Sequence, residues 1–272
     1  MYSRSELATD FRGLGLRPGD VVMVHASVRS IGEIAGGPDQ IHLAIKDAIT
    51  DAGTMMMYAG CPDYYDDVGR GVYPGSTERE ILEKMPPFDP LTARAARGHG
   101  TLVEFFRSYP GTMVNHHTAR FAVWGAQAQH LISEQPWDFA FGRGSALERF
   151  VALDGKILLI GCDHDTVTFL HYAEHVVDIP GMRIAAFEVP WLENGKRVWK
   201  ETKEVDTSGA GAHASWPERF FAQIVNKHLA RTHNRGGRVG VAHCFLLDAR
   251  GLLDLALTEM RAVAVTSEQS AR

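Results

Sequence analysis

Short apolar runs alternate with amphipathic helical segments over the first sixty residues, and this alternation restricts the fold more than any other feature. Residues 3–14 predict a helix that begins with a capping box. Residues 21–24 form an apolar run short enough for a buried strand, residues 36–50 predict a second helix, and residues 54–58 predict a second strand. Strands that alternate with helices pair in parallel and are covered on both faces. We therefore expect an α/β fold with a central, mostly parallel or mixed sheet flanked by helices.

Later segments continue this alternation, with two interruptions. Residues 60–98 carry few regular signals, several aspartates and several aromatic residues, which favours a long functional loop. Asn194 and Gly195 stand between two runs of strand-forming residues, 183–190 and 196–205, and predict a β-hairpin. The remaining predicted elements are helices at 101–108, 126–134, 145–153, 216–230 and 252–263, and strands at 121–125, 156–160 and 237–247. No repeat or linker divides the chain, so we expect one domain over residues 1–272.

Composition excludes several classes of protein. The formal net charge of −5 argues against nucleic acid as a partner, because phosphate binding needs a basic surface. No apolar run approaches the roughly 20 residues that span a bilayer, and the N-terminus has no apolar signal segment. Three widely spaced cysteines fit neither a disulfide framework nor a structural zinc site. We expect a cytoplasmic protein, either a monomer or a homodimer, that binds neither membrane nor nucleic acid.

Residues 161–175 are the most informative stretch for chemistry. They follow the predicted strand 156–160, and Asp165 is placed to cap a helix with apolar residues on nearly every side. Thr168, His171 and His175 form a polar line on that helix at helical spacing, and Glu174 lies beside it. A buried imidazole with a carboxylate neighbour is what general-base catalysis requires, since the carboxylate orients the ring and stabilises its charged form.

A rival interpretation uses the same residues. His171, Glu174 and His175 spell H-x-x-E-H, the zinc pattern of inverted metalloproteases, so a zinc-dependent hydrolase is one alternative. His116 and His117 are also adjacent, but neighbours in a strand point to opposite faces, which favours His117 as a residue of the site wall.

The end of the predicted strand 21–24 carries a second candidate site. His25, Ser27, Arg29 and Ser30 follow it directly, and hydroxyl groups with a guanidinium at a strand end suit an anionic ligand. The chain has no G-x-G-x-x-G motif and no Walker A loop, so the usual dinucleotide or nucleoside triphosphate site is not supported. It also lacks the G-x-S-x-G elbow of α/β-hydrolases.

Several segments together resemble the aminoglycoside 3-N-acetyltransferase family. The most specific, residues 168–174, reads T-F-L-H-Y-A-E and is similar to the family segment T-x-L-H-x-A-E. The others lie at 24–30, 88–90, 105–111, 141–145 and 153–161, in family order and spacing. The chain departs from the family at 114–118, where V-N-H-H-T replaces R-S-x-H-P and leaves the role of His116 and His117 open. No loop of the GCN5-related acetyltransferases is found.

The resemblance implies acetyl transfer from acetyl-coenzyme A to the 3-amino group of an aminoglycoside antibiotic, without a metal. It gives His171 the role of base, with Glu174, Thr168 and Asp63 in support. It implies that coenzyme A contacts residues of two segments, 25–30 and 141–145: His25, Ser27, Arg29, Ser30, Phe141, Gly142 and Ser145. It also implies that the cationic antibiotic meets an acidic set, with His117 in the wall: Asp63, Tyr64, Asp67, Glu204 and Asp206. A non-catalytic family member that only binds these ligands is a further alternative.

Overall fold

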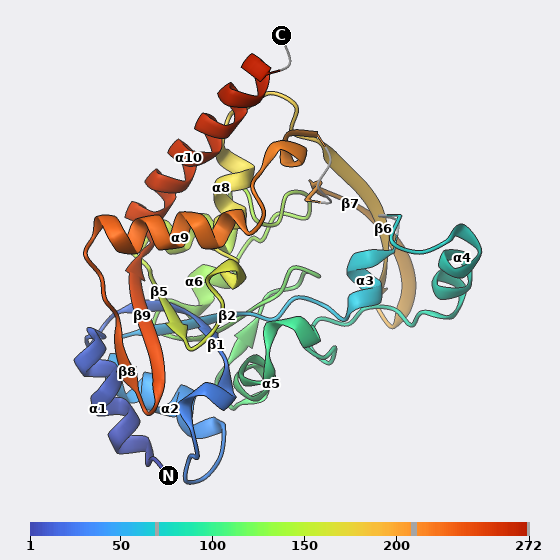
Figure 1. The fold of residues 1–272 in the computed structure, drawn as a ribbon. Coiled ribbons are helices and arrows are strands. Elements are labelled where there is room, and N and C mark those ends of the chain that lie inside the picture. Colours follow the sequence, from blue (N-terminus) through green and yellow to red (C-terminus); the bar gives the residue numbers. More distant parts are fainter. Residues whose placement is uncertain (69–70, 208–210, 271–272) are drawn as a thin grey trace.

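The computed structural model describes residues 1–68, 71–207 and 211–270, and a seven-stranded sheet lies at its centre (Figure 1). The strand order is β3-β4-β2-β1-β5-β9-β8. The bounds are β1 Val21–Ala26, β2 Thr54–Tyr58, β3 Met113–Val114, β4 Phe121–Gly125, β5 Lys156–Ile160, β8 Gly237–Val239 and β9 Ala242–Asp248. The predicted strands at 54–58, 121–125 and 156–160 are confirmed at both ends.

The sheet is mixed, as predicted. β1 pairs in parallel with β2 and with β5, and Met23 lies opposite Met56 on one side and Ile157 on the other. β4 and β9 then pair antiparallel to β2 and β5, and the edge strands β3 and β8 are antiparallel as well. Parallel pairing within this sheet is thus limited to the three central strands β2, β1 and β5, and each strand outside them runs antiparallel to its neighbour.

Helices cover both faces of the sheet (Figure 1). Residues of β1 alternate between two apolar cores: Val21 and Met23 join one, Val22 and Val24 the other. The first core is closed by α6 Ala128–Ile132, α7 Ala146–Ala152, α8 Leu170–Val176, α9 Phe220–Arg231 and α10 Ala249–Ser270. The second is closed by α1 Arg4–Leu14, α2 Asp39–Ile49 and α5 Thr101–Ser108. None of the helices within the described ranges is long and apolar enough to cross a membrane.

A long β-hairpin stands away from the sheet (Figure 1). Its strands are β6 Ile184–Glu193 and β7 Lys196–Val205, with Asn194 and Gly195 at the turn, so the predicted hairpin is confirmed. Its inner face packs on the 60–98 segment, where Phe88 pairs with Trp191 in a small third core. The cavity described below lies where this hairpin approaches the main body.

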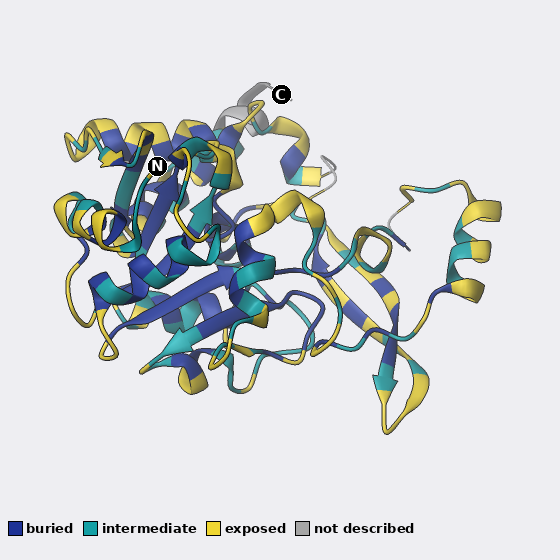
Figure 2. Ribbon diagram, turned by 90° about the horizontal axis from the view of Figure 1, so that it is seen from below, coloured by how far each residue is buried: buried dark blue, intermediate teal, exposed yellow. Residues whose placement is uncertain are grey.

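The expectation that residues 60–98 lack regular structure was wrong in two places. α3 Asp63–Asp67 and α4 Gly75–Lys84 lie within this segment. Neither helix contains a buried residue, and α4 is drawn almost entirely in the colours for exposed and intermediate residues (Figure 2). Without a buried stripe a helix leaves no apolar period in the sequence, which explains why both helices escaped prediction.

Arg120 fastens this segment to the sheet. Its side chain is fully buried beside β4. Nε donates to the carbonyl of Gly60 at 2.9 Å, Nη1 to those of Pro90 and Ala93 at 2.6 and 2.7 Å, and Nη2 to that of Arg94 at 2.7 Å. One guanidinium therefore satisfies four carbonyl groups at both ends of the 60–98 segment.

The helix that carries His171 begins later than expected. Asp163 rather than Asp165 accepts from the backbone, at the amide of Asp165, and opens a short 3-10 turn over His164–Thr166. The Asp165 carboxylate instead accepts from the amide of Ala222 at the start of α9. The predicted cap at Asp165 was therefore wrong, because a tertiary contact with α9 takes up that side chain.

Candidate active site

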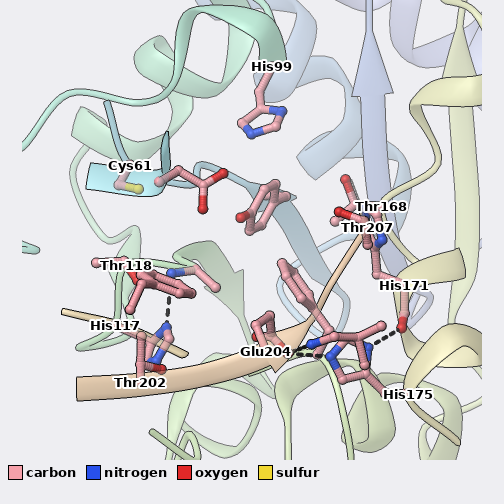
Figure 3. A pocket seen from close by; sticks show the side chains of 16 residues that line it. Cys61, His99, His117, Thr118, Thr168, His171, His175, Thr202, Glu204 and Thr207 are labelled. Carbon is pink, nitrogen blue, oxygen red and sulfur yellow. Dashed lines mark hydrogen bonds and ion pairs between the residues drawn. The ribbon is translucent and has the colours of Figure 1, made fainter. Parts of the chain in front are cut away.

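A cavity of about 170 Å³ lies between α8, the hairpin and the 60–98 segment (Figure 3). The helix α8 contributes His171 and His175, and the end of β7 contributes Glu204. The other lining residues are Tyr58, Cys61, Asp66, His99, His117, Thr118, Ala119, Phe141, Thr168, Phe187, Thr202, Val205 and Thr207. Segments far apart in the sequence therefore meet around His171.

His171 and Glu174 form a close pair on α8. Nδ1 of His171 lies 2.5 Å from Oε2 of Glu174, whose side chain is only 3% exposed, whereas the His171 side chain is 33% exposed. Burial by itself would lower the pKa of His171, but the charge and the hydrogen bond of Glu174 outweigh it and raise this pKa. Because the carboxylate accepts from Nδ1, Nε2 is left as the ring nitrogen that can take up a proton.

A second histidine–carboxylate pair lies beside the first. His175 donates from Nδ1 to the carbonyl of His171 at 2.6 Å, and its Nε2 contacts Oε1 of Glu204 (Figure 3). The other oxygen of Glu204 accepts from the amide of Ala140 at 2.9 Å. Glu204 is therefore buried and fixed at the cavity wall, at the end of a strand rather than on an exposed loop.

The zinc pattern does not gather its side chains at one point. Both ring nitrogens of His175 are hydrogen-bonded within the protein, so zinc binding there would require the Glu204 contact to break. Within residues 1–68, 71–207 and 211–270 no group of three His, Cys, Asp or Glu side chains is arranged to hold a metal ion.

The predicted acidic residues are distributed unevenly. Asp66, which was not singled out, lines the cavity, whereas Asp63 lies exposed at the first position of α3. The carboxylate of Asp67 accepts from the hydroxyl of Tyr73 at 3.0 Å, and Tyr64 is 55% exposed outside the cavity.

Asp206 also stands outside the cavity wall. Its amide donates to the carbonyl of Arg183 at 2.9 Å, and its carboxylate lies 3.9 Å from Nε of the same residue.

His117 belongs to the cavity wall, in keeping with the sequence interpretation. It is buried, its Nδ1 accepts from the amide of Ala119 at 2.9 Å, and its Nε2 lies 2.9 Å from the carbonyl of Trp137. Burial lowers the pKa of His117, so its ring is neutral at pH 7. His116 is exposed and lines a different hollow.

A second cavity of about 230 Å³ adjoins the first at the end of β1. His25, Ser27 and Cys162 line it, and Tyr58, His99 and Thr168 line both cavities. Burial lowers the pKa of His25 to about 3, and its buried Nε2 has no hydrogen-bond partner in the described part of the chain. Two hollows that share one wall can take the reacting parts of two molecules placed end to end.

The other residues predicted to contact a cosubstrate take different positions. Arg29 is exposed on the 3-10 turn Val28–Ile31, and Ser30 donates to the carbonyl of Ser27 at 2.7 Å. The ring of Phe141 lies 5.3 Å from that of His171 and lines the first cavity. Gly142 donates to the carbonyl of Phe139 in a tight turn. Ser145 is fully buried and caps α7, so its hydroxyl already accepts hydrogen bonds from backbone amides of that helix.

Three residues near His171 were missed by sequence reasoning. Asp66 was hidden in an acidic run whose helix was not predicted, and His99 follows the irregular segment. His213, on the 3-10 turn Gly211–Ser215, approaches Glu174 from a distant part of the chain. Isolated histidines carry no pattern, so only the tertiary structure reveals them.

These features define the class of protein. The fold is an α/β fold around a mixed sheet, and two adjoining cavities lie at the ends of its strands. The first cavity has a histidine–carboxylate pair and further carboxylates in its wall. Such a site is expected of an enzyme that brings two substrates together. The chain belongs to the aminoglycoside 3-N-acetyltransferase family, whose model matches residues 23–261. The resemblance seen in the motifs is thereby confirmed.

Individual relatives agree over nearly the whole length. Aminoglycoside N(3)-acetyltransferase III of Pseudomonas aeruginosa is 35% identical over 261 residues, which cover 94% of this chain and 92% of that protein. Among solved structures, AAC-IIIb in a binary complex with CoASH has a TM-score of 0.87 at 38% identity and covers 96% of this chain and 97% of its own. AAC-VIa bound to sisomicin has a TM-score of 0.87 at 36% identity, with 96% and 98% covered.

Proposed function

We propose that this protein transfers the acetyl group of acetyl-coenzyme A to the 3-amino group of an aminoglycoside, with His171 as the general base. The observation that carries the proposal is the bond from Nδ1 of His171 to the buried Glu174, at the wall of an acidic cavity. Relatives of this chain carry the aminoglycoside N(3)-acetyltransferase name, and solved neighbours hold CoASH or sisomicin.

The proposed reaction is a single acyl transfer. Nε2 of His171 takes a proton from the substrate amine as its nitrogen attacks the thioester carbonyl carbon, and a C–N bond forms. The C–S bond then breaks, the electron pair leaves with the sulfur, and the proton on His171 passes to the thiolate, which gives the amide and free coenzyme A thiol. Glu174 stabilises the imidazolium between these two steps.

The first cavity suits the cationic acceptor. Asp66 lines it. The negative charges of Asp66 and Glu204 both favour the charged form of His171, so both carboxylates interact electrostatically with the base. An aminoglycoside is larger than about 170 Å³ of enclosed space, so its outer rings must lie over the rim. Asp63, Tyr64, Asp67 and Asp206 are proposed as outer contacts there.

The second cavity suits the cosubstrate. His25 and Ser27 line it at the end of β1, and Arg29 and Ser30 follow on the next turn. A pantetheine arm entering along this side would place its thioester at the shared wall, next to Thr168. The three cysteines are free thiols, in keeping with a cytoplasmic location where acetyl-coenzyme A is available.

The test is an acetylation assay with purified protein, acetyl-coenzyme A and a panel of gentamicin, tobramycin and apramycin. We expect release of free thiol and a product acetylated at the 3-amino group, as determined by NMR. Absence of thiol release with every antibiotic would favour a protein that only binds these ligands. Stoichiometric zinc whose removal abolishes activity would instead contradict the metal-free mechanism.

A further inference from the structure

Glu174 is held between two histidines rather than one. Its Oε2 lies 2.5 Å from Nδ1 of His171, and its Oε1 lies 3.2 Å from Nε2 of His213. The Glu174 side chain is 3% exposed and that of His213 is 6% exposed, so water has little access to either group. Each carboxylate oxygen therefore has its own imidazole partner.

His213 comes from a separate part of the chain. It lies on the 3-10 turn Gly211–Ser215, which follows the hairpin and precedes α9, whereas His171 and Glu174 share α8. Its ring packs against that of Trp216 with the centroids 4.2 Å apart. Its Nδ1 is buried and has no hydrogen-bond partner within the described residues, so Nε2 is the nitrogen that it uses, toward Glu174.

We propose that His213 is a positioning residue for the acetyl transfer, one that donates from Nε2 to Oε1 of Glu174 and so keeps Oε2 on His171. This inference rests on the proposed function, because it assigns His213 a part in the same reaction. His213 does not line either cavity and acts through the carboxylate alone.

The physical reason is the need of a buried carboxylate for donors. Burial would raise the pKa of Glu174, but His171 and His213 together lower it to about 2, so the carboxylate is charged at neutral pH. With only one donor, Oε1 would be buried without a partner, and the carboxylate would be harder to ionise and free to turn. Either change weakens its bond to His171.

Other charged groups around the base are few. His171 also feels the carboxylates of Glu204, on β7, and Asp66, on α3. On the turn Arg97–His99, burial lowers the pKa of His99 to about 4, and the charge of His171 contributes to this shift. All three groups lie on elements other than the turn that carries His213, so replacement of His213 leaves them in place.

The decisive variants differ only in the donor. His213→Phe keeps the ring but removes the N–H group, whereas His213→Gln places an amide N–H where Nε2 stood. We expect His213→Phe to lower kcat about tenfold, the loss of one hydrogen bond to a charged group, with both KM values within about twofold. His213→Gln should stay within about threefold of the wild-type kcat. His213→Asn, whose amide is too short to reach Glu174, should behave like the Phe variant and serves if that variant folds poorly.

The control is a buried histidine elsewhere. His228, on α9, is buried and its Nε2 lies 3.4 Å from the carboxylate of Asp248. His228→Phe should change the melting temperature without changing kcat. Equal kcat in His213→Phe and the wild type, or a Gln variant as slow as the Phe variant, would overturn the proposal.

Two further measurements separate this inference from the proposed function. In a Glu174→Gln background, His213→Phe should add nothing to the loss of kcat, because it acts through that carboxylate. The imidazole of His171, followed by NMR without substrates, should titrate at lower pH in the Phe and Asn variants and unchanged in the Gln variant. This titration tests whether His213 acts on His171 through Glu174, even if no aminoglycoside is acetylated. An unshifted titration of His171 in both the Phe and the Asn variants would contradict the proposed role of His213.

Discussion

Glu204, at the end of β7, contacts Nε2 of His175, which lies on α8 next to the proposed base. The contact joins the projecting hairpin to the helix that carries His171, and the amide of Ala140 holds the other carboxylate oxygen. Closure of the cavity and placement of the base are therefore linked through one buried ion pair.

Replacement of this carboxylate should affect stability first. Glu204→Ala leaves a buried histidine without its partner, so the free energy of unfolding should fall by about 3 kcal/mol, measured in urea. Asp206→Ala, at a carboxylate 3.9 Å from Arg183, should change it by less than about 1 kcal/mol and instead raise KM for the antibiotic. Equal stability of Glu204→Ala and the wild type would mean that the pair does not hold the hairpin.

Removal of the proposed base should affect turnover rather than binding. His171→Ala should lower kcat by about 100-fold or more, since general-base catalysis contributes at least that much. Antibiotic affinity, measured by calorimetry, should stay within a few fold because Asp66 and Glu204 remain in the wall. The assignment fails if this variant keeps a kcat near that of the wild type.

The pH dependence should reflect the raised pKa of His171. The base works only when neutral, so kcat/KM should be low at acidic pH and rise through the pKa of this residue. Since Glu174 raises that pKa above the ordinary 6.5, the midpoint should lie above 6.5. Glu174→Gln removes the charge and should move the midpoint to lower pH. A midpoint below 6.5 in the wild type would contradict the pairing.

Arg120 offers a test of how the 60–98 segment is held. Arg120→Met removes donors to four carbonyl groups, so stability should fall by about 3 kcal/mol or more. Proteases should then cleave within residues 60–98 before the rest of the chain. Arg4→Met is a suitable comparison, because the Arg4 guanidinium donates to the carboxylate of Asp47 on α2, which lies outside this segment. Identical cleavage of the Arg120 variant and the wild type would show that the segment is held by other contacts.

Sequence patterns were most reliable where burial imposes a period. β2, α5, β4 and β5 were predicted to the residue, since each buries apolar side chains against the central cores. The two helices of the 60–98 segment bury none and were missed. The cap at Asp165 failed for a different reason: its carboxylate is used by α9, more than fifty residues later.

The sequence by itself determined the fold class, the family and the pairing of His171 with Glu174, because short-range spacing places Glu174 one helical turn away. Only the tertiary structure decided the rest of the site. Asp66 and His99 reach the cavity from distant segments, His213 reaches Glu174, and Glu204 proved to be a buried partner of His175. The reason is that a local sequence pattern reflects contacts between residues close in the chain, whereas contacts between distant segments produce no such pattern.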